Sequence, residues 1–94
     1  MEITLAIAGP LTPREVPGLT LRVTKLLERT GATRLCCDVA LLQADAVALD
    51  ALARVALAAR RAGAQLILQG ASGELLSLIS FIGLDGAIRE AGSR

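Results

Sequence analysis

The chain alternates short apolar segments with longer amphipathic ones, and this order constrains its fold more than any other feature. In residues 2–7 the large apolar Ile3, Leu5 and Ile7 alternate with polar or small side chains, the pattern of a half-buried strand. Residues 34–39 and 65–68 are short and mostly apolar, which is typical of central strands covered on both faces. Because helical patterns separate these strands, we expect βαβ crossovers, a mostly parallel sheet and a small α/β layer protein.

Capping residues predict where the helices begin. Thr12 and Glu15 have the spacing of a capping box, with Thr12 as the N-cap, although a nearby proline leaves the start open by a few residues. Asp45 and Ser72 are the expected N-caps of the second and third helices. Residues 84–91 are predicted to form one more short helix.

Composition limits both the size of the domain and its class of partner. Ninety-four residues make one small domain, residues 1–94, and with 53% hydrophobic residues and one aromatic, Phe81, its core is expected to be aliphatic. Ten basic against nine acidic residues leave a net charge of +1, without the basic face that nucleic acid requires. The sequence has no signal-peptide pattern and no apolar run near the ~20 residues of a membrane span, so we expect a cytoplasmic protein.

Few enzymatic arrangements are compatible with this composition. The chain contains no histidine, which removes Ser–His and Cys–His nucleophile pairs and imidazole metal ligands. Cys36 and Cys37 are adjacent in a predicted strand and therefore point to opposite faces, a poor geometry for a disulfide. No GxGxxG or P-loop pattern occurs. We therefore predict a protein that is not an enzyme and has neither a cofactor nor a metal.

Two segments allow a ligand-binding interpretation, which we weigh against a structural one. Residues 70–73 lead into a helix N-terminus that could hold an anion, but a turn and cap is the favoured interpretation. Asp38, Asp45 and Asp50 follow a strand and could together hold Mg²⁺. The favoured interpretation is that Asp45 caps a helix and Asp50 is solvated.

Several short motifs also follow one another in a familiar order. They are Gly9-Pro10-Leu11-Thr12, Val16-Pro17-Gly18-Leu19, Cys37-Asp38-Val39, Asp45-Ala46-Val47-Ala48-Leu49-Asp50, Ala59-Arg60-Arg61-Ala62-Gly63, Leu66-Ile67-Leu68, Ser72-Gly73-Glu74-Leu75 and Ile82-Gly83-Leu84-Asp85. Together they resemble STAS domains, the sulfate-transporter and anti-sigma-factor-antagonist family. The resemblance implies a four- or five-stranded, mixed or mostly parallel sheet with helices mainly on one face. It also implies a bacterial regulatory module in transcription that binds a protein partner, often an anti-sigma kinase.

Residues 45–50 fall where that family shows Asp-Ser-Ser/Thr-Gly-Leu-Gly, the segment whose phosphorylation breaks the complex. Here Ala46 stands at the acceptor position and carries no hydroxyl group, while Ala48 and Asp50 replace glycines. By this resemblance the partner-binding residues are Asp45, Ala46, Val47, Leu49 and Asp50, and Ala46 is not phosphorylated.

Three hypotheses of function follow. The first is a non-catalytic anti-sigma-factor-antagonist-like module that binds an anti-sigma factor or kinase and is not switched by serine phosphorylation. The second is a small structural STAS subunit of a membrane transporter ATPase or scaffold. The third is a nucleotide-binding module that uses residues 70–72 or the strand ends. Leu21 and Leu42 are expected to be exposed and are candidates for a homodimer surface, although single exposed leucines are ordinary.

Overall fold

The sheet is fully parallel and its strands lie in sequence order. The computed structural model describes residues 1–84, 86 and 88–90. Its elements are β1 (Glu2–Ala6), α1 (Glu15–Thr30), β2 (Arg34–Asp38), α2 (Ala46–Arg61), β3 (Gln65–Gln69), α3 (Gly73–Phe81) and β4 (Ile88–Glu90). The four strands pair in the order β1–β2–β3–β4, and each pair is parallel. This confirms the α/β prediction from the alternating segments.

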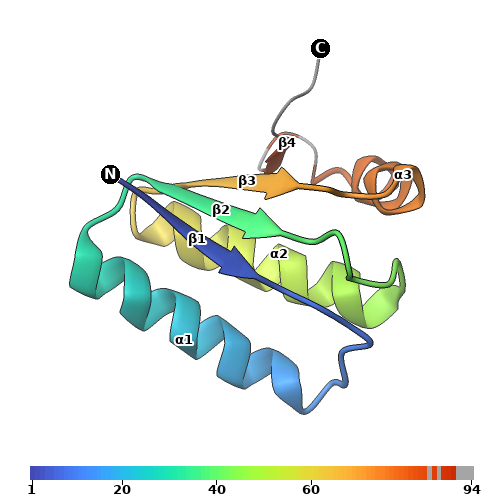
Figure 1. Ribbon diagram of the computed structural model, residues 1–94, viewed down its shortest axis with the longest axis horizontal. Coiled ribbons are helices and arrows are strands. Elements are labelled where there is room, and N and C mark those ends of the chain that lie inside the picture. Colours follow the sequence, from blue (N-terminus) through green and yellow to red (C-terminus); the bar gives the residue numbers. More distant parts are fainter. Residues whose placement is uncertain (85, 87, 91–94) are drawn as a thin grey trace.

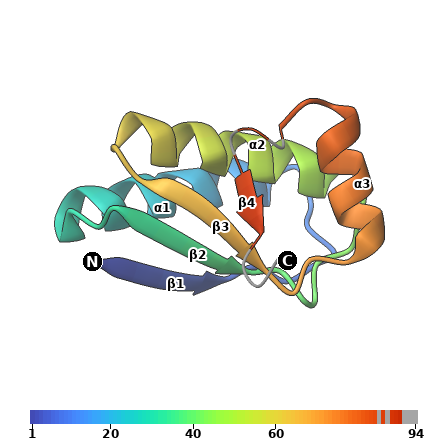
Figure 2. The same cartoon turned by 90° about the horizontal axis from the view of Figure 1, so that it is seen from above.

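The helices lie mainly on one face of the sheet, as expected. Figure 1 shows α1 and α2 side by side beneath the strands, and Figure 2 places α3 beyond the carboxyl end of β3. No helix covers the opposite face in the part of the chain that the structure describes. Within those residues no helix has the length and apolar character needed to cross a membrane.

The C-terminal segment differs from the prediction. A short helix was expected over residues 84–91, but Ile88–Glu90 forms β4, which pairs in parallel with β3. Ile88 lies beside Leu66 in this pairing and is buried, so the strand is held by the neighbouring strand and by the core. Asp85, Ala87 and Ala91, which the prediction also covered, lie outside the described residues.

The core between the sheet and the two long helices is aliphatic. Alternate strand residues point into it, namely Leu35, Cys37, Leu66, Leu68 and Ile88. The facing side of α2 is rich in alanine, and its buried residues are Ala48, Ala51, Leu52, Val55, Ala56, Ala58 and Ala59. Small side chains let this helix lie close to its neighbours, so α2 is embedded along most of its length.

The start of α1 combines a confirmed contact with a wrong assignment. The Glu15 carboxylate accepts hydrogen bonds from the Thr12 backbone N–H at 2.8 Å and from the Thr12 hydroxyl at 3.1 Å. One half of the predicted capping box therefore exists. However, the helix begins at Glu15 and its N-cap is Arg14, not Thr12, because the Thr12 hydroxyl donates to Glu15 instead of accepting from the backbone.

The two cysteines are free and buried, on opposite faces of β2. Burial, with a smaller contribution from Cys36, raises the pKa of the Cys37 thiol to about 12. Burial, and then the nearby Glu2 carboxylate, raises the pKa of Cys36, which Arg34 partly opposes. Both groups are therefore protonated thiols near neutral pH, and the thiolate is the reactive form.

We therefore expect the native protein to react slowly with iodoacetamide at mildly alkaline pH, whereas the urea-unfolded chain reacts at both cysteines. The variant Ser77→Cys adds a thiol at an exposed position of α3 and provides the positive control. Mass spectrometry of the labelled protein gives the readout. Native labelling of Cys37 as fast as that of the introduced thiol would contradict the burial described above.

Candidate functional site

The candidate site lies at the carboxyl edge of the sheet, where three loops meet. Open parallel sheets commonly place functional residues at this edge. The Gly9 N–H donates to the Leu41 carbonyl at 3.1 Å, which ties the loop after β1 to the loop after β2. Gly70, in the loop after β3, has φ +74°, and a Cβ there would lie 3.0 Å from the Cβ of Ala40. The loop over residues 39–45 is therefore held from both sides before α2 begins.

Asp45 caps α2, as predicted. Its backbone is extended, with φ −135° and ψ 179°, and one carboxylate oxygen accepts a hydrogen bond from the Ala48 N–H at 2.8 Å. The Asp45 carbonyl also accepts from the Leu49 N–H at 3.0 Å. These bonds satisfy backbone donors that a helix start leaves unpaired. The first turn of α2 is therefore fixed by the side chain that the sequence places immediately before it.

Replacement of this cap tests its contribution. We expect Asp45→Ala to lower the free energy of unfolding by about 1 kcal/mol, within the usual range for a lost N-cap. The matched control is Asp50→Ala on the same helix, where an exposed i,i+4 pair is lost at a cost of about 0.5 kcal/mol or less. Urea denaturation of both variants measures the difference. An equal effect of the two substitutions would show that Asp45 is not acting as a cap.

The five predicted partner-binding residues lie together in the first turns of α2. Ala46 and Asp50, four residues apart, are exposed. Val47 and Leu49 are half-buried and pack against the core. Asp45 is half-buried because its carboxylate is engaged in the cap. A partner would therefore meet a small, mostly apolar surface with one exposed charged side chain, that of Asp50. We call it the α2 surface (Asp45, Ala46, Val47, Leu49 and Asp50).

Ala48 supports the exposed residues of the α2 surface from beneath. It stands where a glycine is expected by the family resemblance, and its methyl group is wholly buried. Alanine has a higher helix propensity than glycine by roughly 1 kcal/mol. The substitution therefore stabilises the first turn and fills part of the core beneath the exposed residues.

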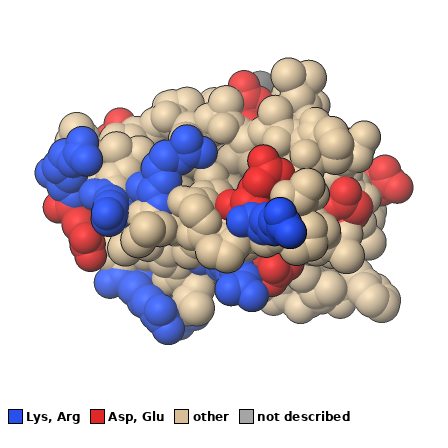
Figure 3. All heavy atoms as spheres, turned by 90° about the horizontal axis from the view of Figure 1, so that it is seen from below, with Lys and Arg blue, Asp and Glu red and all other residues tan. Residues whose placement is uncertain are grey.

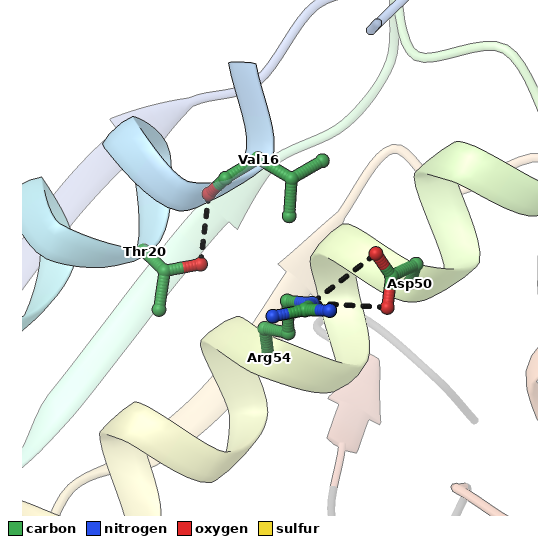
Figure 4. A network of polar contacts seen from close by, with 4 residues as sticks. All are labelled: Val16, Thr20, Asp50 and Arg54. Atoms are coloured by element: carbon green, nitrogen blue, oxygen red, sulfur yellow. Dashed lines mark hydrogen bonds and ion pairs between the residues drawn. The ribbon is translucent and has the colours of Figure 1, made fainter. Parts of the chain in front are cut away.

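The charge of Asp50 is partly compensated within α2. The Arg54 Nε lies 3.0 Å and 3.2 Å from the two carboxylate oxygens of Asp50. Figure 4 shows Arg54 reaching along the helix to Asp50, while the Thr20 hydroxyl on the neighbouring helix turns back to the Val16 carbonyl. Both side chains of the ion pair are more than half exposed, so the pair orients Asp50 but adds little stability.

Sequence reasoning missed one exposed apolar residue in the loop that leads into the candidate site. Leu41 is 77% exposed in the loop that leads to Asp45, whereas the adjacent Leu42, proposed as a candidate exposed position, is buried at 6%. The prediction for Leu42 is therefore wrong, and Leu21, the other candidate, is exposed at 54%. Two consecutive leucines in a loop carry no local signal of which one points inward, so only the fold separates them.

A groove between α1 and α2 lies on the outer face of the helix layer. It encloses about 440 Å³ between Thr20, Thr24 and Glu28 of α1 and a stretch of α2 that contains Leu57 and Arg61. Figure 3 shows this face with basic side chains mostly over its left half and acidic side chains prevailing on the right. In Figure 1 the helices begin on the right, so the α2 surface lies at the more acidic end.

At both segments with an alternative ligand-binding interpretation, the acidic loop after β2 and the turn over residues 70–73, the side chains make local structural contacts. Three or more acidic, cysteine or histidine side chains do not converge into a metal-binding group anywhere among the described residues. Asp38 is turned back on its own loop, where it accepts from the Ala40 N–H at 3.1 Å. Ser72 accepts from the Leu75 N–H at 3.1 Å, which is the cap geometry favoured for the turn over residues 70–73.

Comparison with known proteins gives one family match. The model described as "Mlab, STAS domain" matches residues 1–90, which is nearly the whole chain. No curated protein sequence matches significantly. The match spans all seven helices and strands that the described residues form, and the whole α2 surface.

Proposed function

Because the chain belongs to the STAS family described as Mlab, STAS domain, we propose that it is a non-catalytic bacterial module that binds a protein partner through the α2 surface. At the level of the family, membership supports a regulatory module of the anti-sigma-factor-antagonist type. The partner and the docking surface are the parts that we propose.

One observation carries the proposal. Ala46 presents a bare methyl group to solvent at the position where a STAS switch carries its acceptor hydroxyl, and no serine, threonine or tyrosine occurs in residues 45–54. Phosphorylation acts at such a site by adding roughly −1.5 to −2 charges to an interface. With no acceptor on this surface, binding here is not released by phosphorylation of the switch position.

The first candidate partner is an anti-sigma factor or kinase in the cytoplasm. Support comes from the STAS fold and from the placement of all five α2-surface residues in one and a half helical turns. The exposed methyl and half-buried aliphatic side chains offer an apolar contact. Asp50, already oriented by Arg54, offers a charge at its rim.

A second candidate function is favoured by the same residue. A structural subunit of a membrane transporter ATPase remains bound to its partner and needs no release switch. Both alanines suit a surface that stays bound to its partner. Ala46 has no hydroxyl group that could be phosphorylated, and the buried Ala48 stabilises the first turn of α2. In this role the chain would bind the ATPase of the transporter and stabilise it, without inserting into the membrane.

The proposal includes the absence of catalysis. The chain has no histidine, and its two thiols are buried with raised pKa values, so a nucleophile activated by a neighbouring base has little support. Nucleotide binding at residues 70–72 has less support than docking at α2. The Ser72 hydroxyl already caps α3, and Glu74 places a negative charge in the first turn, where phosphates would have to approach.

Affinity capture from the native host tests the proposal. Two baits are compared, the wild-type chain and Ala46→Glu, and the proteins that bind only the wild type are identified by mass spectrometry. An anti-sigma factor or kinase in this set supports the first candidate, and a transporter ATPase supports the second. A set of proteins retained equally by both baits would contradict docking through α2.

A further inference from the structure

We propose that β1 is a self-association edge, where β1 of one copy pairs antiparallel with β1 of a second copy about a twofold axis at Thr4. The two four-stranded sheets would then join into one continuous sheet. This inference concerns the side of the molecule away from β3 and β4, and it does not rest on the proposed function.

The outer side of β1 is an open strand edge. In the strand order β1–β2–β3–β4, β1 pairs with β2 on one side and has no strand on the other among the described residues. Figure 2 shows β1 along this border of the sheet. Its sequence, Glu2–Ala6, contains neither a proline nor a lysine, the residues that commonly block edge pairing. Unpaired N–H and C=O groups on such an edge favour pairing with another strand.

The direction of the backbone groups follows from the bonds to neighbouring segments. The Met1 carbonyl accepts from the Thr33 N–H at 3.0 Å, and the Ile7 N–H donates to the Asp38 carbonyl at 2.9 Å. Residues 1 and 7 therefore point their backbone groups toward β2, and by alternation residues 3 and 5 do so as well. The N–H and C=O groups of Glu2, Thr4 and Ala6 point to the open edge.

These three residues are symmetric about Thr4. Antiparallel pairing on the twofold axis places Thr4 opposite Thr4 of the second copy, and Glu2 opposite its Ala6. In an antiparallel ladder, each such pair exchanges both N–H···O bonds. All the outward backbone groups of β1 are then satisfied by one register, with no strand residue left over.

The side chains are complementary in the same register. Toward the helices, Ile3 lies opposite Leu5 of the second copy, and both are only half-buried in the single chain. On the other face, threonine meets threonine, and Glu2 meets alanine instead of a second glutamate. Apolar pairs and threonine pairs stabilise neighbouring strands, whereas opposed like charges destabilise them. No like-charged pair arises along β1.

A hollow beside β1 provides an independent argument. It is an open depression of about 420 Å³, lined by Ile7, Leu11 and Leu19 together with the charged Glu15 and Arg22. Met1 is 73% exposed, a large apolar side chain with little cover of its own. The register about Thr4 places Met1 of the second copy opposite Ile7, on the helix-facing side. The exposed methionine of each copy would therefore reach the aliphatic part of this hollow in the other.

Sedimentation of Thr4→Lys tests the pairing. We expect the wild type to sediment with twice the chain mass at micromolar concentrations and to dissociate on dilution. In the variant, two lysines face each other at the axis, which should raise the dimer dissociation constant by about tenfold or more. Ser77→Lys, the same charge on an exposed hydroxyl residue of α3, should behave as the wild type. Circular dichroism checks that both variants are folded.

Amide hydrogen exchange identifies the contact. The Thr4 and Ala6 amides should be protected in the wild-type dimer and exchange quickly in Thr4→Lys. A wild type that remains monomeric at high micromolar concentration would overturn the proposal. So would a dimer in which the Thr4 amide exchanges freely, because the contact would then involve another face, such as that of the exposed Leu21.

Discussion

Replacing Leu52 by alanine should lower the free energy of unfolding by about 2–5 kcal/mol, the usual range for a buried leucine. Leu52 is completely buried in the middle of α2, among alanines that have no longer side chains to fill the space left behind. The cavity would therefore persist, and the melting temperature should fall by about 10 °C or more for a domain of this size.

The matched control for this substitution is Leu57→Ala. Leu57 lies on the same helix but is 48% exposed, so its truncation should cost much less, about 0.5 kcal/mol if it behaves as an ordinary surface position. Thermal and urea denaturation at one protein concentration measure the loss of stability in both variants. A similar loss in the two variants would show that α2 is not embedded against the sheet as described.

The second large effect is expected on partner binding. Ala46→Glu places a fixed negative charge on the exposed methyl position, beside Asp45 and Asp50. A glutamate in the first turn is compatible with the helix dipole, so the fold should be retained. Within an interface, an unpaired charge costs about 2 kcal/mol or more, which corresponds to roughly a thirtyfold rise in the dissociation constant.

Two controls make this prediction specific. Ala46→Ser has a hydroxyl but no charge and should bind within about threefold of the wild type, since a small exposed substitution changes energies by roughly 0.5 kcal/mol. Ser77→Glu adds the same charge to an exposed position of α3 and should bind normally. Calorimetric titration of the captured partner measures all four proteins. Unchanged affinity of Ala46→Glu would remove Ala46 from the interface.

The sequence predicted the parts of the fold whose signals are local. Asp45 and Ser72 cap their helices as expected, because a cap depends on a side chain and on backbone donors three residues away. The alternation of short apolar strands with helices likewise predicts a parallel sheet, because parallel neighbours need a long crossover connection, usually a helix.

The parts that failed depend on distant residues. β4 is a strand of three residues, too short to show an alternating pattern in its own sequence. It forms because it pairs with Leu66–Leu68 of β3. The burial of Leu42 and the exposure of Leu41 depend in the same way on neighbouring loops. For the candidate site, the resemblance placed its five residues together, but only the structure separates exposed Ala46 and Asp50 from half-buried Val47 and Leu49.

The most direct test of docking through α2 is a methyl NMR titration with the captured partner. The predicted result is that the largest shift changes fall on the methyl groups of Ala46, Val47 and Leu49, with little change at Leu21 on α1 or Leu78 on α3. Largest changes at Leu21 or Leu78, with the α2 signals unmoved, would contradict a partner-binding role for the first turns of α2.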